Sequence, residues 1–192
     1  MSKSDNALGA PGISSCIAVL QGKSLKSLKV CNCGLSSEAS KLLSDILHKD
    51  GMPKLILFHF YNNMSGDGGA KAVAEILSDS PQLEDFRFSA TRSMHPGCKA
   101  VAEALNKTTL IKRLDLSDNI FGPDSGKILA QSLENIPNLT YLNLRDCDLD
   151  SEGVEALFDT FESIDSKIEY LDLSGICIKK FNTIFIFLKI TT

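Results

Sequence analysis

The chain has 192 residues, a net charge of −4 and no block of like charge. This acidic balance argues against nucleic acid as a partner, because phosphate binding needs a concentrated basic surface. No membrane insertion is expected either, since the apolar stretch 181–190 contains Lys189 and is far shorter than the roughly 20 residues of a spanning helix. The polar segment 1–12 lacks the apolar core of a signal peptide.

A repeated pattern organises the chain. The stretch Leu114–Gly122, preceded by Ile111, reads L-x-x-L-x-L-x-x-N-x-L, which is the signature of a leucine-rich repeat. Copies of this pattern put their Asn position, here called the ladder position, at residues 6, 33, 63, 91, 119, 147 and 176. Because the spacings all lie close to 28 residues, they indicate one repeat array.

Taken in chain order, the repeats form one predicted domain over residues 1–178. A partial repeat covers 4–24, and further repeats begin near 25, 55, 83, 111, 139 and 168. The second half of each copy has the apolar spacing of an amphipathic helix, at 10–20, 37–48, 66–77, 96–105, 123–133 and 151–161. Residues 179–192 are predicted to be an atypical apolar tail.

The predicted fold is an α/β leucine-rich repeat solenoid of the ribonuclease-inhibitor kind. Each strand joins a parallel sheet on the concave side, and each helix lies on the convex side, because a single repeat cannot bury its own core. Asn63 and Asn119, at ladder positions, are expected to bond turn backbones that would otherwise be buried and unpaired. Cys33 and Cys147 take the same position as small buried side chains.

The cysteines do not indicate a metal site. Cys31 and Cys33 stand two residues apart, but no second Cys or His pair lies at zinc-ligand spacing, and the pattern puts the two side chains on opposite sides of the strand. We expect reduced thiols, no metal, no cofactor and an intracellular location.

Polar residues recur just before each ladder position, where the strand turns over and a side chain cannot point inward. This rim row comprises Asp5, Asn32, Asn62, Ala90, Asp118, Asp146 and Gly175. Neighbouring concave positions carry Lys29, His59, Tyr61, Arg87, Arg113, Asp115, Tyr141, Asn143, Arg145 and Asp172. Such a mixed polar groove suits a protein partner. A soluble solenoid must also have polar surface somewhere, and for any single residue general surface polarity is the better explanation.

Catalysis by the chain itself is not indicated. The three histidines are scattered, and neither G-x-S-x-G nor H-E-x-x-H occurs. The run Gly66–Gly69 lacks the Gly-Lys-Ser/Thr ending of a phosphate-binding loop and is interpreted as a strand-to-helix turn. We therefore expect a protein that is not an enzyme and binds no nucleotide.

The amino-acid sequence of three stretches, 4–9, 58–67 and 83–92, resembles the leucine-rich domain of the Ran GTPase-activating protein in its plant form. The likeness covers about residues 4–178. The family's repeats upstream of Asp5, its nuclear-envelope targeting domain and its acidic C-terminal tail have no counterpart here, so the chain is expected to be truncated at both ends.

The resemblance implies an enzyme regulator that activates GTP hydrolysis on GTP-bound Ran, alone or with a Ran-binding protein, in nucleocytoplasmic transport. Members of this family use a rim asparagine that holds the GTPase's own glutamine in place, and the matching residue here is Asn32. Asp118 matches an acidic position that faces a basic part of Ran, and Asp5, Asn62 and Asp146 lie in the same row as further partner contacts. The implied location is the cytoplasm or the nuclear envelope.

A second class of function stays open. The same rim row would serve a non-catalytic interaction scaffold, or an inactive truncated paralogue of the activator.

Overall fold

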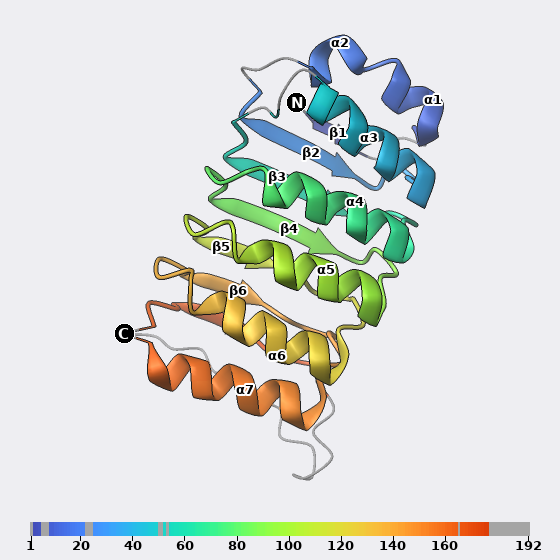
Figure 1. The fold of residues 1–192 in the computed structure, drawn as a ribbon. Coiled ribbons are helices and arrows are strands. Elements are labelled where there is room, and N and C mark those ends of the chain that lie inside the picture. Colours follow the sequence, from blue (N-terminus) through green and yellow to red (C-terminus); the bar gives the residue numbers. More distant parts are fainter. Residues whose placement is uncertain are drawn as a thin grey trace.

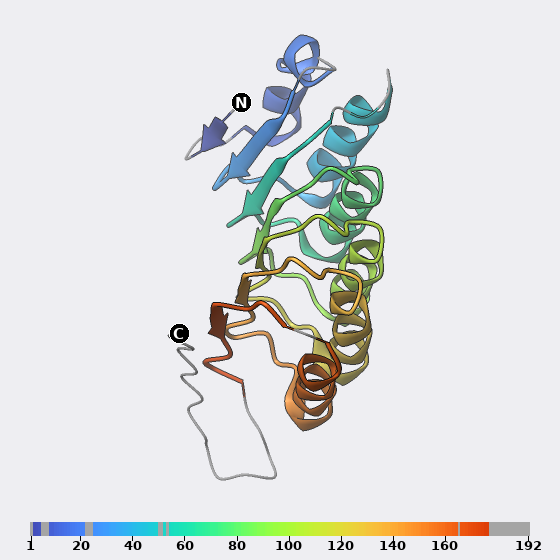
Figure 2. The ribbon, with the colours of Figure 1, turned by 90° about the vertical axis from the view of Figure 1, so that its left-hand side faces the viewer.

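The computed structural model describes residues 2–4, 8–21, 25–49, 52, 54–164 and 166–176. Within these residues, seven strands form one sheet in chain order, every neighbouring pair is parallel, and the helices lie on one side of the sheet (Figures 1 and 2). Figure 2 shows strands and helices as two curved files, with the strands on the inside of the curve. This confirms the predicted leucine-rich repeat solenoid.

The strands are short. They are β1 (Ser2–Ser4), β2 (Ser27–Cys31), β3 (Leu57–Tyr61), β4 (Asp85–Ser89), β5 (Arg113–Asp115), β6 (Tyr141–Asn143) and β7 (Tyr170–Asp172). From β2 onward each strand begins two residues after a repeat start predicted from the sequence. Of the predicted partial repeat 4–24, the structure describes residue 4 and residues 8–21. The predicted tail 179–192 lies outside the described residues.

Helices alternate with the strands. They are α1 (Gly9–Ser14), α2 (Ile17–Leu20), α3 (Ser37–Lys49), α4 (Gly66–Ser78), α5 (His95–Leu105), α6 (Gly122–Leu133) and α7 (Asp150–Ser163). The last five lie within two residues of the predicted bounds. Pro96 and Pro123 stand in the first turns of α5 and α6, where the missing N–H costs little.

One predicted helix, over 10–20, is wrong in detail because it is divided into α1 and α2. The hydroxyl of Ser14 donates to the carbonyl of Ala10 at 3.1 Å, and that of Ser15 donates to the carbonyl of Pro11 at 3.0 Å. Such back-bonding competes with the helix's own hydrogen bonds and favours a bend. The chain leaves helical geometry at Cys16, with φ −99° and ψ 4°, before α2 begins.

The core lies between the sheet and the helices and continues from repeat to repeat. Phe58 pairs in register with Phe86, and Phe60 with Phe88, and all four rings are fully buried. Ring centroids are 5.9 Å apart in the first pair and 6.1 Å in the second. Each repeat therefore completes the core of the previous one, as stacked repeats do in solenoid proteins.

Glycines let neighbouring helices approach closely. A Cβ added at Gly68 would lie 1.8 Å from Oγ of Ser37 in the preceding helix, and one added at Gly126 would lie 3.0 Å from Cα of Gly153. The run Gly66–Gly69, expected to be a strand-to-helix turn, is the first turn of α4. Close helix packing is thus a structural reason for this glycine-rich run.

The ladder asparagines bind the repeat before their own, as predicted. Oδ1 of Asn63 accepts from the backbone N–H groups of Cys33 at 3.1 Å and Leu35 at 3.3 Å, while Nδ2 donates to the carbonyl of Val30 at 2.9 Å. Asn119 makes the equivalent bonds to Thr91 and Phe88. Each asparagine therefore satisfies buried backbone groups in the turn of its neighbour.

The turns alternate between two forms. After the ladder asparagines 63 and 119, the left-handed residue comes three positions later, at Gly66 and Gly122. After ladder positions 33 and 91 it comes at the next residue, which is Gly34 or Arg92. After position 147 it comes at both places, Asp148 and Asp150. The turns from position 33 to position 119 thus alternate in form, an order that the sequence analysis did not predict.

Candidate functional site

The rim row has one backbone conformation throughout the described residues. Its φ angles are 52° at Asn32, 53° at Asn62, 50° at Ala90, 57° at Asp118, 51° at Asp146 and 76° at Gly175. This left-handed region is accessible to glycine and tolerated by Asn and Asp, but costs other residues roughly 1–2 kcal/mol. The turn geometry alone therefore explains most of the residue types in this row, and Ala90 is the member that the geometry does not favour.

The predicted site residues of the rim row lie at the surface. All four described members, Asn32, Asn62, Asp118 and Asp146, are exposed. The two asparagines directly follow β2 and β3, and the two aspartates lie three residues after β5 and β6. Nδ2 of Asn62 donates to Oδ1 of Asn32 at 3.1 Å, so the structure brings these two predicted residues together. The fifth predicted residue, Asp5, lies outside the described residues.

The acidic part of the rim row is partly neutralised within the chain. Nε of Arg145 lies 3.0 Å from Oδ2 of Asp146, and both side chains are well exposed. The carboxylate of Asp146 therefore already has a cationic partner, and exposed pairs of this kind contribute little to stability. Hydrogen bonding to Asp146 raises the pKa of the Arg145 guanidinium, which stays charged in any case.

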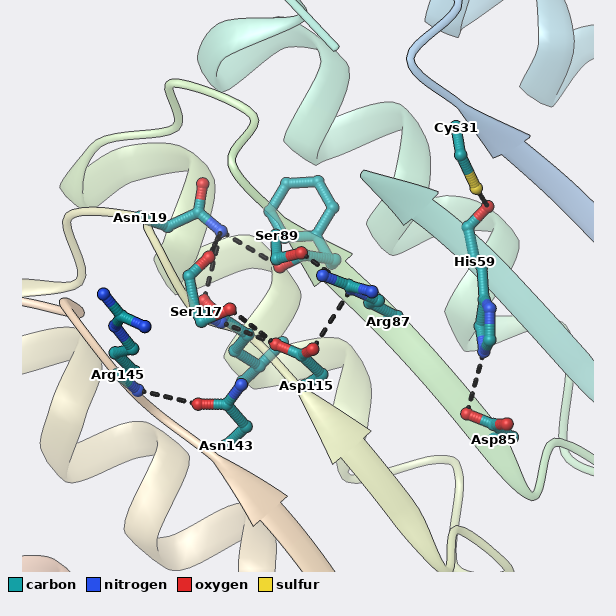
Figure 3. A network of polar contacts seen from close by, with 12 residues as sticks. Cys31, His59, Asp85, Arg87, Ser89, Asp115, Ser117, Asn119, Asn143 and Arg145 are labelled. Atoms are coloured by element: carbon teal, nitrogen blue, oxygen red, sulfur yellow. Dashed lines mark hydrogen bonds and ion pairs between the residues drawn. The ribbon is translucent and has the colours of Figure 1, made fainter. Parts of the chain in front are cut away.

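The concave face carries a network of paired acidic and basic side chains (Figure 3). His59 Nε2 lies 2.9 Å from Oδ1 of Asp85, and Nε of Arg87 lies 3.1 Å from Oδ2 of Asp115. The other oxygen of Asp115 accepts from the hydroxyl of Ser117 at 2.7 Å and from its backbone N–H at 3.1 Å. Because both oxygens of Asp115 are used within the chain, this carboxylate holds Arg87 rather than offering itself to a ligand.

Aromatic rings and guanidinium groups stack on the same face. The guanidinium carbon of Arg87 lies 4.0 Å from the ring centroid of Tyr61, and that of Arg113 lies 4.1 Å from the ring centroid of Tyr141. Tyr141 in turn stacks on Tyr170, with centroids 4.4 Å apart and planes 3° from parallel. Burial raises the pKa of the Tyr141 phenol, so its hydroxyl stays protonated at neutral pH.

A shallow hollow of about 170 Å³ lies over β3 to β6, lined by residues of this network, among them His59, Asp85, Arg113 and Tyr141. Typical small-molecule sites enclose about 300–1,000 Å³. The hollow is therefore small for a metabolite and comparable to a side chain of a partner. No cluster of three or more His, Cys, Asp and Glu side chains that could hold a metal ion occurs within the described part of the chain.

Exposed apolar side chains accompany the rim row, and sequence reasoning missed them. Met64 is 61% exposed and Met94 53% exposed, on the turns after β3 and β4, and Ile120 is 39% exposed after β5. Their only signal in the sequence is that they fall at turn positions which the repeat pattern leaves outside the core. Together they add an apolar component to a polar edge, as protein interfaces commonly have.

The cysteines that the structure describes are free thiols. Cys31 and Cys33 are both buried, with Sγ of Cys31 3.7 Å from the carbonyl oxygen of His59 and Sγ of Cys33 3.3 Å from that of Cys31. Burial raises the pKa of Cys98 to about 12 and that of Cys147 well above its ordinary value. The last two thiols stay protonated and have no nucleophilic character at neutral pH.

These features define the chain as a leucine-rich repeat solenoid with polar and aromatic side chains on its concave face and rim. The "Leucine Rich repeat" family matches residues 135–158. Comparison with the curated proteins gives no significant match. Among the helices that the structure describes, none is both long and apolar enough to cross a membrane.

Solved structures share the fold. The tropomodulin C-terminal domain from Caenorhabditis elegans is 16% identical, with a TM-score of 0.62 over 78% of this chain and 91% of that one. Leiomodin-1 Actin-Binding Site 2 is 15% identical, with a TM-score of 0.59 over 78% and 87%. An internalin from Listeria monocytogenes is 16% identical, with a TM-score of 0.52 over 84% and 45%. At these identities the likeness concerns the fold.

Proposed function

We propose that this chain is a protein-binding solenoid that engages the small GTPase Ran in its GTP-bound form and promotes GTP hydrolysis by that partner. It would act as a regulator, alone or with a Ran-binding protein, in the cytoplasm or at the nuclear envelope. The observation that carries the proposal is the position of Asn32: it is exposed on the rim and paired with a second asparagine.

The pairing gives Asn32 a defined orientation. Because Oδ1 accepts from Asn62, a contact between repeats restrains the side-chain amide. An amide can donate and accept at once, which suits holding the side-chain amide of a glutamine in the partner. That glutamine would orient the attacking water, so the nucleotide chemistry would remain within the GTPase.

A non-catalytic scaffold is the second candidate. The left-handed geometry of the rim row favours Asn and Asp without any role in catalysis. The exposed methionines at the same edge fit binding alone. The solved structure named Leiomodin-1 Actin-Binding Site 2 is consistent with a protein-binding use of this fold, although it concerns a different protein.

Single-turnover hydrolysis of GTP on Ran separates the two candidates. The informative variants are Asn32→Gly, which keeps the left-handed conformation, and Asn32→Asp, which also keeps the acceptor for Asn62 but removes the amide donors. Asp148→Gly is the matched control, because Asp148 is exposed with φ 47° outside the rim row.

We expect the unaltered chain to accelerate hydrolysis and both Asn32 variants to lose roughly 100-fold of that acceleration, the scale for removal of one pre-positioned donor. The control should retain the full rate. Binding to Ran without acceleration would refute the activator and support the scaffold, and absence of binding would refute Ran as the partner.

A further inference from the structure

A continuous stack of side chains crosses the last three strands of the concave face. Arg113, Tyr141 and Tyr170 stand at paired register positions on β5, β6 and β7. The guanidinium lies 4.1 Å from the ring of Tyr141, which stacks on Tyr170 at 4.4 Å. Because all three start from neighbouring strands of one sheet, the backbone holds the stack in place before any partner arrives.

Arg113 differs from the other two arginines of this face. Arg87 and Arg145 each lie against a carboxylate of the chain, at distances of 3.1 and 3.0 Å. Arg113 is exposed, and within the described residues it forms no ion pair; its side chain stacks on the ring of Tyr141. A guanidinium stacked on a ring keeps its N–H donors in its own plane, where a carboxylate can accept two of them.

The surroundings favour a protein segment over other ligands. The adjoining hollow of about 170 Å³ is the size of a side chain rather than of a metabolite. Asp85 and Asp115 also line it, and each already lies within 3.1 Å of a basic side chain, His59 or Arg87. Tyr170 is 42% exposed, so the outer end of the stack offers an aromatic surface to an apolar side chain.

We propose that the concave face docks a protein segment that places an Asp or Glu carboxylate against Arg113 and an aromatic or aliphatic side chain over Tyr141 and Tyr170. Stacked Tyr and Arg side chains are the residues that most often dominate interface energies. Because these side chains are already stacked on the sheet, they lose less conformational entropy on binding. The inference deepens the protein-binding part of the proposed function and does not depend on Asn32, which lies on the rim beside β2 and β3.

The test is a titration of the full chain, labelled with ¹⁵N, with the peptide N-acetyl-Gly-Glu-Phe-Glu-Leu-Gly-amide. We expect saturable shifts of the Arg113 Nε–H signal and of backbone amides in β5 to β7, with a Kd on the order of 1 mM. The same peptide with Gln in place of Glu should bind about tenfold more weakly, because it loses the charged acceptors.

Variants assign the effect to the stack. Arg113→Gln should weaken binding of the Glu peptide about tenfold, and Arg113→Lys should weaken it too, because an ammonium group does not reproduce the planar stacked donor. The matched control Arg92→Gln removes an exposed arginine away from this face and should leave the affinity unchanged. Melting curves of all three variants should coincide with that of the unaltered chain.

Three outcomes would overturn the inference: no saturable shift in β5 to β7, equal affinity for the Glu and Gln peptides, or an equal loss of affinity in Arg92→Gln. The result is separable from the GTPase assay. Asn32→Gly should bind the peptide normally, so either proposal can fail while the other stands.

Discussion

Replacement of the ladder residue Asn119 by alanine measures what the asparagine ladder contributes to stability. Asn119 is 2% exposed; its Oδ1 accepts from the Thr91 N–H at 3.3 Å, and its Nδ2 donates to the carbonyl of Phe88 at 3.0 Å. Asn119 also donates to the carbonyls of Leu116 and Ser117, but these carbonyls have other donors. The Cys147 thiol donates to Leu116, and the Ala90 N–H donates to Ser117. Two buried backbone groups therefore lose their partner, as does the buried hydroxyl of Thr91, which donates to Oδ1 at 2.8 Å.

An unsatisfied buried group costs roughly 1–3 kcal/mol, so three of them give an expected loss of at least about 3 kcal/mol in the free energy of unfolding. Equilibrium unfolding in urea checks this value, with the m-value compared between variants to test for a single transition. Asn135→Ala is the control, because Asn135 is exposed and donates one hydrogen bond to Asn106 at 3.1 Å. A loss for Asn119→Ala no larger than that of the control would refute the reasoning.

Three further predictions concern the backbone, the core and a thiol. Ala90→Gly should raise the free energy of unfolding by about 1 kcal/mol, since Ala90 has φ 50°, and thermal melting should then rise by about 2–4 °C. Phe60→Ala should lower the free energy of unfolding by about 3–5 kcal/mol in urea, because the ring is fully buried against Phe88. The Cys98 thiol has a pKa raised from 9.0 to about 12 by burial, so its contribution to stability should be fully present below the unfolded-state pKa of 9.0 and be lost as the pH rises from there toward 12. In the variant Cys98→Ala this loss between pH 9 and pH 12 should be smaller, as measured by urea unfolding at each pH.

The repeat period allowed most of the fold to be predicted, because the same residues that define the pattern are those that the core buries. Leu114, Leu116 and Phe121 in the central copy are all fully buried, and the ladder role of Asn119 follows from its position alone. The division of the predicted helix over 10–20 at Cys16 was not predictable from apolar spacing, because the hydrogen bonds from Ser14 and Ser15 to the helix backbone leave no trace in that pattern.

The candidate site was predictable in position but not in its contacts. The pattern placed Asn32 and Asn62 on the surface, yet the hydrogen bond between them depends on strand register and on left-handed turns. Similarly, the sequence identified the polar residues of the concave face. It did not predict which of them form ion pairs or stacks, because these contacts join neighbouring strands. The ion pair of Arg87 with Asp115 and the stack of Arg113 on Tyr141 both join residues 28 positions apart.

The alternating turn forms between ladder positions 33 and 119 link each repeat to both of its neighbours. Asn63 reaches back to the turn at Cys33 with its side chain, while the N–H of Gly66 donates forward to the carbonyl of Thr91 at 3.0 Å. Deletion of the copy between Asn63 and Asn119 would bring two turns of the same form together and remove the acceptor at Thr91. We therefore expect this part of the array to tolerate a change in length by two repeats, the 56-residue spacing from Asn63 to Asn119, better than a change by one.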